Sequence, residues 1–203
     1  MNNVEQQTEE WFQERAGFIT ASRASDMMAK GKGITREKYR TDLAIERYTE
    51  MPIRSGFSNI HTERGNALEA EARELYSLFY GVEIEQTGFI KHPILEWVGA
   101  SPDGIIIDEK GNIEIKSPVP HVHIGYAINK KIPNDYMLQM QLGMAVTIKD
   151  YCDFISYCPE LPPRLRLFVM RVPKDDKVIK TLEDATIEFN QEINALCAEL
   201  KKL

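Results

Sequence analysis

The chain has 203 residues, of which 43% are hydrophobic and 28% are charged, and its formal net charge at pH 7 is −6. These are ordinary values for a globular protein, and the length predicts one domain, residues 1–203, with a substantial core. No apolar stretch approaches the length of a membrane span, and the acidic N-terminus does not resemble a signal peptide, so we expect a cytoplasmic protein. Three cysteines without Cys-x-x-Cys spacing exclude the four-thiolate ligand set of a usual iron–sulfur cluster.

The N-terminal part of the chain is predicted to be helical. Gly17 should end the first helix, and Thr20 or Ser22 should cap the second. Gly81 should stop the longest helix, which carries an apolar stripe along one side. Four helices are predicted. The first covers residues 4–15, the second runs from the cap at Thr20 or Ser22 to residue 30, and the other two cover 35–50 and 61–80.

Strands and helices then alternate. Runs of β-branched and aromatic residues predict strands at 82–91, 97–100, 105–108, 113–116, 151–157 and 167–172. Residues 121–131 are predicted to be helix or loop, 135–147 a buried helix, and the segment after Pro173 an amphipathic helix. This order predicts an α/β fold in which helices flank a central mixed β-sheet.

Residues 101–118 carry the most informative pattern. An apolar run, a Lys-Gly-Asn turn and a second β-rich run predict a hairpin with Asp103 at its mouth. Because side chains alternate along a strand, Glu114 and Lys116 point to one face and Ile115 to the other. Two carboxylates and an ammonium can then converge. This set suits a hard divalent cation and the orientation or deprotonation of a water, the equipment of a metal-dependent phosphodiesterase.

The alternative is a solvated hairpin, because an Asp, a Glu and a Lys at this loose spacing are common. Two details favour a metal site over a solvated hairpin. Glu114 and Lys116 stand in an Ile-rich strand that is predicted to be buried, where charged side chains are rare unless they have partners or a function. Pro102 and Gly104 bracket Asp103 and fix a turn at the strand entrance. The net negative charge argues against a nucleic-acid partner, although local clusters of charge matter more than the total.

Four blocks, in this order, resemble the phage lambda exonuclease family, also called YqaJ-type viral recombinases, within the PD-(D/E)XK nuclease superfamily. The resemblance extends from about Trp11 to the last helix and implies a restriction-endonuclease-like core. The blocks are Trp11…Arg15-Ala-Gly-Phe-Ile-Thr-Ala-Ser22, Arg64-Gly-Asn-Ala-Leu-Glu69, Ser101-Pro-Asp-Gly…Glu114-Ile-Lys116 and Tyr136-Met-Leu-Gln139-Met-Gln141.

The resemblance implies a catalytic site. Asp103, Glu114 and the backbone carbonyl of Ile115 match the ligands of a two-metal site for Mg²⁺, with Mn²⁺ as the alternative. Lys116 matches the residue that positions or activates the attacking water. The two further members of the catalytic set are Glu69, on the long helix, and Gln139, which would orient Lys116 or the water. A solvated helix face is the alternative for Glu69, and a structural bond to the backbone is the alternative for Gln139.

The resemblance also implies a pocket for a terminal 5′-phosphate, formed by Arg15, Ser22 and Ser101. Arg15 has the alternative of satisfying carbonyls at a helix end, and Ser22 that of an N-cap. One position departs from the family, because Thr62 stands where an apolar side chain is expected to wedge apart the duplex end. Phe57 or Ile60 are the substitutes that the sequence offers for that role.

The activity implied is 5′→3′ exonuclease digestion of double-stranded DNA ends to mononucleotides, which leaves 3′ single-strand overhangs for single-strand annealing recombination. The implied partners are two further copies of the chain in a ring-shaped homotrimer and a phage single-strand annealing protein, in the cytoplasm of a bacterial host and without a membrane. Two alternatives stay open: another PD-(D/E)XK nuclease of the RecB or Cas4 type without an iron–sulfur cluster, and a non-catalytic scaffold that binds DNA ends.

Overall fold

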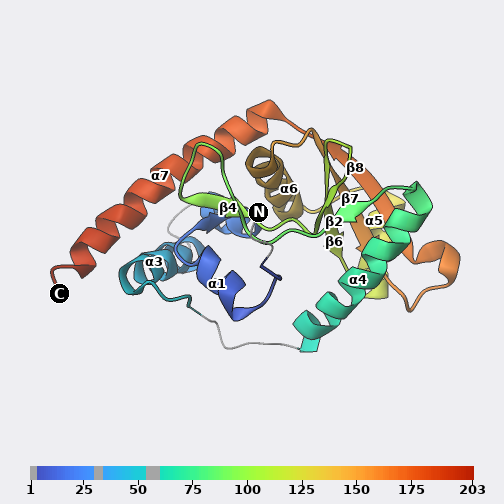
Figure 1. Ribbon diagram of the computed structural model, residues 1–203, viewed down its shortest axis with the longest axis horizontal. Coiled ribbons are helices and arrows are strands. Elements are labelled where there is room, and N and C mark those ends of the chain that lie inside the picture. The colour runs from blue at the N-terminus through green and yellow to red at the C-terminus, as the bar shows by residue number, and fades with distance from the viewer. Residues whose placement is uncertain (1–3, 30–33, 54–59) are drawn as a thin grey trace.

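The computed structural model describes residues 4–29, 34–53 and 60–203, apart from the side chains at 60–64 and 66. Figure 1 shows two regions that face each other across the molecule. One contains the helices α1 (Glu9–Arg15), α2 (Ala24–Met28), α3 (Ile34–Thr49) and α7 (Asp176–Leu200). The other contains a β-sheet with α4 (Ile60–Tyr80) and α5 (Pro120–Asn129), and α6 (Asn134–Thr147) packs between the two regions. No helix within the described residues is both long enough and apolar enough to cross a bilayer.

The main sheet has five strands in the order β2-β5-β6-β7-β8. It is mixed, because β6 and β7 are parallel whereas the other neighbouring strands are antiparallel. Helices α5 and α6 connect β6 to β7, as a parallel crossover requires. The predicted central mixed sheet is therefore present. Its strands are β2 (Ile84–Glu85), β5 (Gly104–Ile106), β6 (Gly111–Lys116), β7 (Tyr151–Tyr157) and β8 (Leu167–Pro173).

Helices cover both faces of this sheet. Ala72 and Tyr76 of α4 pack with Ile113 and Ile115 of β6 on one face. On the other face, α6 contributes Met140 and Met144 to a cluster with residues of β7 and β8. Strand β6 is therefore buried on both sides, and a charged residue on it needs partners within the protein.

A second, three-stranded sheet with the order β1-β4-β3 lies against α2, α3 and α7. Its strands are β1 (Ile19–Thr20), β3 (Ile90–Lys91) and β4 (Val98–Ala100). The prediction of one strand over 82–91 was wrong, because this segment leaves one sheet as β2 and enters the other as β3. Gly88 lies between these two strands and lets the chain pass close to Val4. A Cβ at position 88 would lie only 2.7 Å from the Val4 carbonyl oxygen.

Two other boundaries differ from the prediction. The first helix begins at Glu9, because the Thr8 side chain accepts a hydrogen bond from the Trp11 N–H and caps the helix there. The hairpin turn lies at 107–110 with Asp108 in a left-handed conformation, and Gly111 and Asn112 already belong to β6. A tight 3₁₀ turn, η1 (Ala21–Arg23), precedes α2, which ends at Met28.

Candidate active site and phosphate pocket

Asp103 lies between β4 and β5 and is fixed to β6 by its own side chain. Its Oδ2 accepts a hydrogen bond of 2.6 Å from the backbone N–H of Ile115. Gly104, the next residue, pairs with Ile113, and a Cβ at Gly104 would lie 2.4 Å from an Ile84 methyl group. Glycine at 104 therefore lets β2, β5 and β6 approach closely, and this close packing holds the Asp103 carboxylate beside the strand that carries Glu114.

Glu114 is almost fully buried, with 4% of its surface exposed, and the structure supplies its partners. Its Oε1 accepts from Lys116 Nζ at 2.6 Å and from Gln139 Nε2 at 2.7 Å. Both donors hold one oxygen, which leaves Oε2 as the oxygen that can meet a cation. Gln139 thus contacts Glu114, whereas the resemblance implied that it would orient Lys116 or the water.

Lys116 stands among acidic groups. Burial lowers its pKa, but Glu114 and Asp103 more than offset that effect, and the net pKa lies above its ordinary value. Its Nζ also lies 5.0 Å from the centroid of the Tyr136 ring, a cation–π contact. The side chain is therefore a fixed ammonium in this structure, able to donate a hydrogen bond to a water or a phosphate oxygen.

Glu69 faces the same site from α4 with a partly buried side chain. Its Oε1 pairs with Arg73 Nη2 at 2.5 Å, one helical turn away. Arg73 also donates from Nε to the backbone carbonyl of Asp103 at 3.0 Å, so one guanidinium joins α4 to the hairpin mouth. Burial raises the pKa of Glu69; Arg73 lowers it, Glu114 raises it, and the net shift is upward.

The three carboxylates repel one another. Burial, Glu114 and Glu69 together hold the pKa of Asp103 well above its usual range. Among the described residues, no three His, Cys, Asp or Glu side chains form a complete metal-binding group. Mg²⁺ fits this arrangement, because it is commonly held by one or two carboxylates and completed by waters and substrate phosphates. Asp103, Glu114 and the Ile115 carbonyl therefore form a candidate divalent-metal site.

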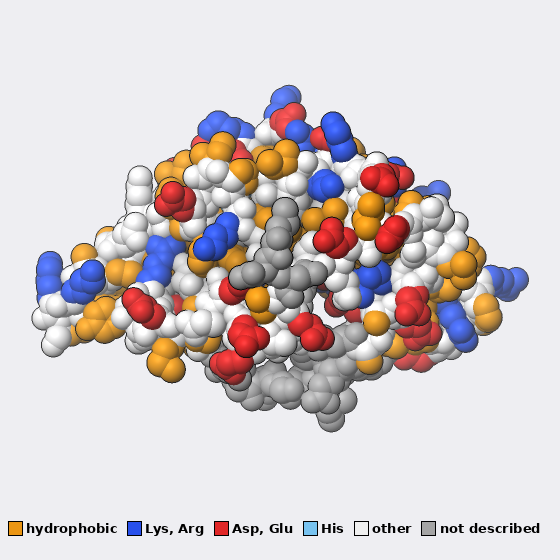
Figure 2. All heavy atoms as spheres, viewed as in Figure 1, with side chains coloured by type: hydrophobic (Ala, Val, Ile, Leu, Met, Phe, Trp, Pro, Cys, Tyr) orange, Lys and Arg blue, Asp and Glu red, His pale blue; other side chains and the backbone are white. Residues whose placement is uncertain are grey.

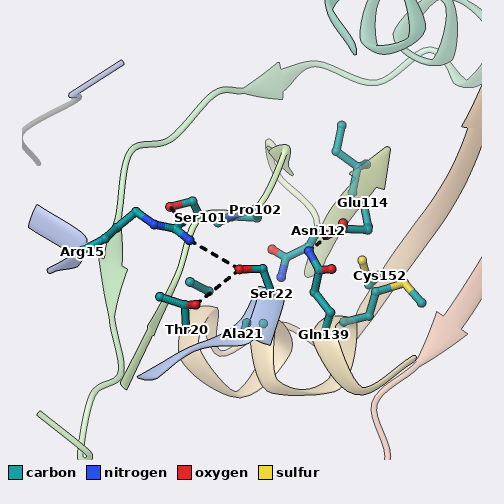
Figure 3. A pocket seen from close by; sticks show the side chains of 14 residues that line it. Arg15, Thr20, Ala21, Ser22, Ser101, Pro102, Asn112, Glu114, Gln139 and Cys152 are labelled. Carbon is teal, nitrogen blue, oxygen red and sulfur yellow. Dashed lines mark hydrogen bonds between the residues drawn. The ribbon is translucent and has the colours of Figure 1, made fainter. Parts of the chain in front are cut away.

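The predicted phosphate-binding residues meet in a second cluster (Figure 3). Arg15 Nη1 donates to Ser101 Oγ at 3.1 Å and Arg15 Nη2 to Ser22 Oγ at 3.4 Å. Arg15 therefore reaches other segments of the chain and does not cap its own helix. Ser22 lies inside η1, and Arg23 occupies the N-cap position of α2, so the N-cap alternative for Ser22 is not what the structure shows. Burial lowers the pKa of Arg15 to about 10, which leaves it cationic at neutral pH.

The cluster of Arg15, Ser22 and Ser101 borders the same pocket as Glu114. In Figure 3 Arg15, Ser22 and Ser101 lie on one side of this pocket, and Glu114 and Gln139 lie on the other. Ser101 and Asp103 are two residues apart on the segment between β4 and β5. An anion at the first cluster would therefore lie next to the carboxylate site.

Sequence reasoning gave no role to three residues of these clusters, namely Trp11, Arg73 and Tyr136. Arg73 follows Glu69 by four residues on a predicted helix, and Trp11 precedes Arg15 by four, so both pairs had the spacing of side chains that touch. Tyr136 begins the fourth block of the resemblance, but no spacing in the sequence connected it with Lys116. Phe57 and the side chains of Ile60 and Thr62, considered for the strand-separating wedge, lie outside the described residues.

A model of the YqaJ-like viral recombinase domain matches residues 10–150. Two uncharacterised relatives are protein R354 of Acanthamoeba polyphaga mimivirus, 27% identical over 168 residues, and YqaJ of Bacillus subtilis, 23% identical over 188 residues. The alignments cover 75% and 92% of this chain but only 29% and 56% of the relatives, so this chain spans a part of their length.

Solved structures resemble the chain over nearly its whole length. The alkaline exonuclease LHK-Exo from Laribacter hongkongensis is 37% identical with a TM-score of 0.89, and the alignment covers 96% of this chain and 97% of that one. A second structure of LHK-Exo, in complex with dAMP, matches equally well at 38% identity. A phage-related exonuclease from Haemophilus somnus shares the fold at 15% identity, with a TM-score of 0.76 over 90% of this chain and 96% of that one. The predicted α/β nuclease core is therefore confirmed.

Proposed function

The chain belongs to the YqaJ-like viral recombinase family, as its motifs predicted, and on that premise we propose that it is a Mg²⁺-dependent 5′→3′ exonuclease acting on duplex DNA ends. It would release mononucleotides and leave 3′ single-strand overhangs. One observation carries the proposal: a pocket of hydrogen-bond donors at Ser101 adjoins a carboxylate site at Asp103 on the same short segment. A terminal 5′-phosphate in the first would place the next phosphodiester near the second.

The relatives support this chemistry. LHK-Exo is named an alkaline exonuclease, and one of its structures contains dAMP, a deoxynucleoside monophosphate. A 5′-mononucleotide is the product expected when an exonuclease holds the terminal phosphate and cleaves one nucleotide further along.

Each side chain has a distinct task in this proposal. Asp103, Glu114 and the Ile115 carbonyl would hold Mg²⁺, with Mn²⁺ as the alternative. When bound as a pair, such ions stabilise the attacking and leaving oxygens of a phosphodiester. Gln139 keeps the Glu114 carboxylate in place, and Lys116 donates a hydrogen bond to the attacking water or to a phosphate oxygen. Glu69, held by Arg73, adds a third acceptor for that water.

We also propose that the chain works as a homotrimeric ring and delivers its product to a phage single-strand annealing protein. The net charge of −6 and the mixture of acidic and basic side chains on the face shown in Figure 2 make a purely electrostatic grip on DNA weak. Enclosure of the duplex would supply processivity without such a grip. Sedimentation at micromolar concentration should give a trimer, and a monomer that digests processively would contradict this assembly.

The activity is tested with duplexes that carry a label at either the 5′ or the 3′ end. With Mg²⁺, we expect immediate release of labelled mononucleotide from 5′-labelled duplex, delayed release from 3′-labelled duplex, and no release from either in EDTA. Release from the 3′ label first would reverse the polarity, and internal fragments would indicate a different nuclease of the same superfamily. Binding of duplex ends without cleavage in Mg²⁺ or Mn²⁺ would indicate a non-catalytic scaffold.

A further inference from the structure

The hydroxyl of Ser101 occupies an unusual position in the hydrogen-bond network of the phosphate pocket. Its oxygen accepts two hydrogen bonds, one from Arg15 Nη1 at 3.1 Å and one from Trp11 Nε1 at 3.0 Å. A serine hydroxyl has two acceptor lone pairs and one proton to donate. The two protein donors therefore use the whole accepting capacity of this oxygen.

The hydroxyl proton of Ser101 must then point away from both donors. Within the described part of the chain this hydroxyl only accepts hydrogen bonds and donates none. Ser101 borders the pocket in Figure 3, so the proton is available to an acceptor that enters the pocket. An anion with several acceptor oxygens suits such a donor, whereas a water or a neutral hydroxyl gains less from it.

Trp11 also holds the other donor of the pocket. The Arg15 guanidinium carbon lies 4.0 Å from the centroid of the Trp11 ring, which is a stacked cation–π contact. Trp11 is itself 8% exposed and stands four residues before Arg15 on α1, so its ring is fixed by packing and faces the same side of the helix. One indole thus contacts both Arg15 and Ser101.

We propose that Trp11 is the positioning residue of the phosphate pocket and that it turns Ser101 into a dedicated hydrogen-bond donor for a terminal 5′-phosphate. Its ring holds the plane of the Arg15 guanidinium, and its N–H occupies the lone pair through which Ser101 would otherwise accept a bond from water. The inference rests on the proposed function, because it assigns the ligand of this pocket as a phosphate monoester at a DNA end.

Two substitutions separate the two contacts of Trp11. Trp11→Phe keeps an aromatic ring near Arg15 and removes the N–H, and Trp11→Leu removes both. The matched control is Trp97→Phe, because the Trp97 indole nitrogen is buried without a hydrogen-bond partner within the described part of the chain. The chain has two tryptophans, so Trp97→Phe also makes Trp11 the sole source of tryptophan fluorescence.

The measurement is the affinity for 5′-phosphorylated and for 5′-hydroxyl duplex in EDTA, where cleavage does not interfere. We expect Trp11→Phe to reduce the ratio of the two affinities by about two- to tenfold, the size of one neutral hydrogen bond. Trp11→Leu should reduce it further, and Trp97→Phe should leave it unchanged. In Trp97→Phe the emission of Trp11 should shift when 5′-phosphorylated duplex is added and shift less with 5′-hydroxyl duplex. Melting temperatures show whether each variant is folded.

A double substitution tests whether Trp11 acts on phosphate binding through the Ser101 hydroxyl. In a Ser101→Ala background, Trp11→Phe should have no further effect on the ratio, because the hydroxyl on which it acts is gone. A full additional effect in that background, or an unchanged ratio in Trp11→Phe alone, would overturn the role of Trp11. A wild-type protein without any preference for the 5′-phosphate would overturn the pocket as well. If the preference is present but no duplex is cleaved in Mg²⁺, the proposed nuclease function fails while the role of Trp11 stands.

Discussion

The two halves of the candidate site differ in how the protein holds their charges. In the phosphate pocket, hydrogen bonds within the protein already orient the donors, and Arg15 is stacked on Trp11. At the carboxylate site, Asp103, Glu114 and Glu69 repel one another, and Lys116 with Arg73 only partly offsets them. The pocket is thus organised before an anion arrives, whereas the carboxylate site gains stability when a cation arrives.

This difference separates two kinds of defect. Substitutions at the carboxylate site should remove catalysis and leave binding of DNA ends intact. Substitutions at the phosphate pocket should remove the preference for a phosphorylated end and leave slow cleavage. The variants below test that separation.

The largest effects are expected on β6. Glu114→Ala should abolish cleavage and Mg²⁺ binding, because the substitution removes a carboxylate ligand. Lys116→Ala should also abolish cleavage but retain Mg²⁺ binding, since the carboxylates remain. Calorimetric titration with Mg²⁺ and a cleavage assay measure the two properties. Glu109→Ala, at the far end of the same hairpin, is the control and should digest DNA normally. Loss of metal binding in Lys116→Ala would contradict the assignment of separate tasks.

Arg15→Ala should have the next largest effect. A hydrogen bond to a charged group contributes about 1.5–3 kcal/mol, so the preference for 5′-phosphorylated over 5′-hydroxyl duplex should fall about ten- to a hundredfold. Slow digestion of both substrates should remain because the carboxylate site is untouched. Arg23→Ala serves as the control, since Arg23 pairs with Asp26 outside the pocket. An equal preference in wild type and Arg15→Ala would place the phosphate elsewhere.

Gly17 ties the phosphate pocket to α3, and its substitution should have a moderate effect. Its φ is +76°, and a Cβ there would lie 2.8 Å from Arg47 Cγ. Gly81 has a φ of +66° but open space around it, so Gly81→Ala isolates the backbone strain, about 1 kcal/mol or more. Gly17→Ala should lower the free energy of unfolding more than Gly81→Ala and should also weaken the preference for a 5′-phosphate. Equal effects of the two substitutions on both quantities would contradict this link.

The smallest expected effect concerns the ion pair between α3 and α7. The hydrogen-bonded Arg36 guanidinium lowers the pKa of Glu192. Because the folded pKa lies below the unfolded one, the pair stabilises the fold above about pH 4.3, and this contribution is lost as the pH falls through the folded pKa. Glu192→Gln should therefore be less stable than wild type at pH 7, by less than about 1 kcal/mol, and the gap should close as the pH falls through the lowered pKa of Glu192. The exposed pair Lys180–Asp184 is the control, and Asp184→Asn should show little difference at either pH.

The sequence predicted what local patterns determine. The hairpin from 101 to 118, the long helix ended by Gly81 and the buried helix that carries Gln139 all follow from periodicity and turn residues. The division of 82–91 between two sheets could not be predicted, because it depends on pairing with strands elsewhere in the chain, β2 with β5 and β3 with β4.

The contacts between site residues also join parts of the chain that are far apart in the sequence. The pattern placed Glu114 and Lys116 on one face, but it did not show that Gln139 would bond to Glu114. The role of Trp11 depends on Ser101, which lies 90 residues further along the chain. The motifs thus indicated which residues form the site, and only the folded structure shows which atoms they present to one another.

The most direct test of the proposed function uses Asp103→Asn. The amide oxygen can still accept the bond from the Ile115 N–H, so the fold should persist, and loss of one of three neighbouring negative charges should not lower the melting temperature in metal-free buffer. The measurement is release of mononucleotides from blunt, 5′-phosphorylated duplex in Mg²⁺ by wild type and by Asp103→Asn. We predict steady release by the wild type and none by the variant. Digestion at the wild-type rate by folded Asp103→Asn would contradict the nuclease mechanism.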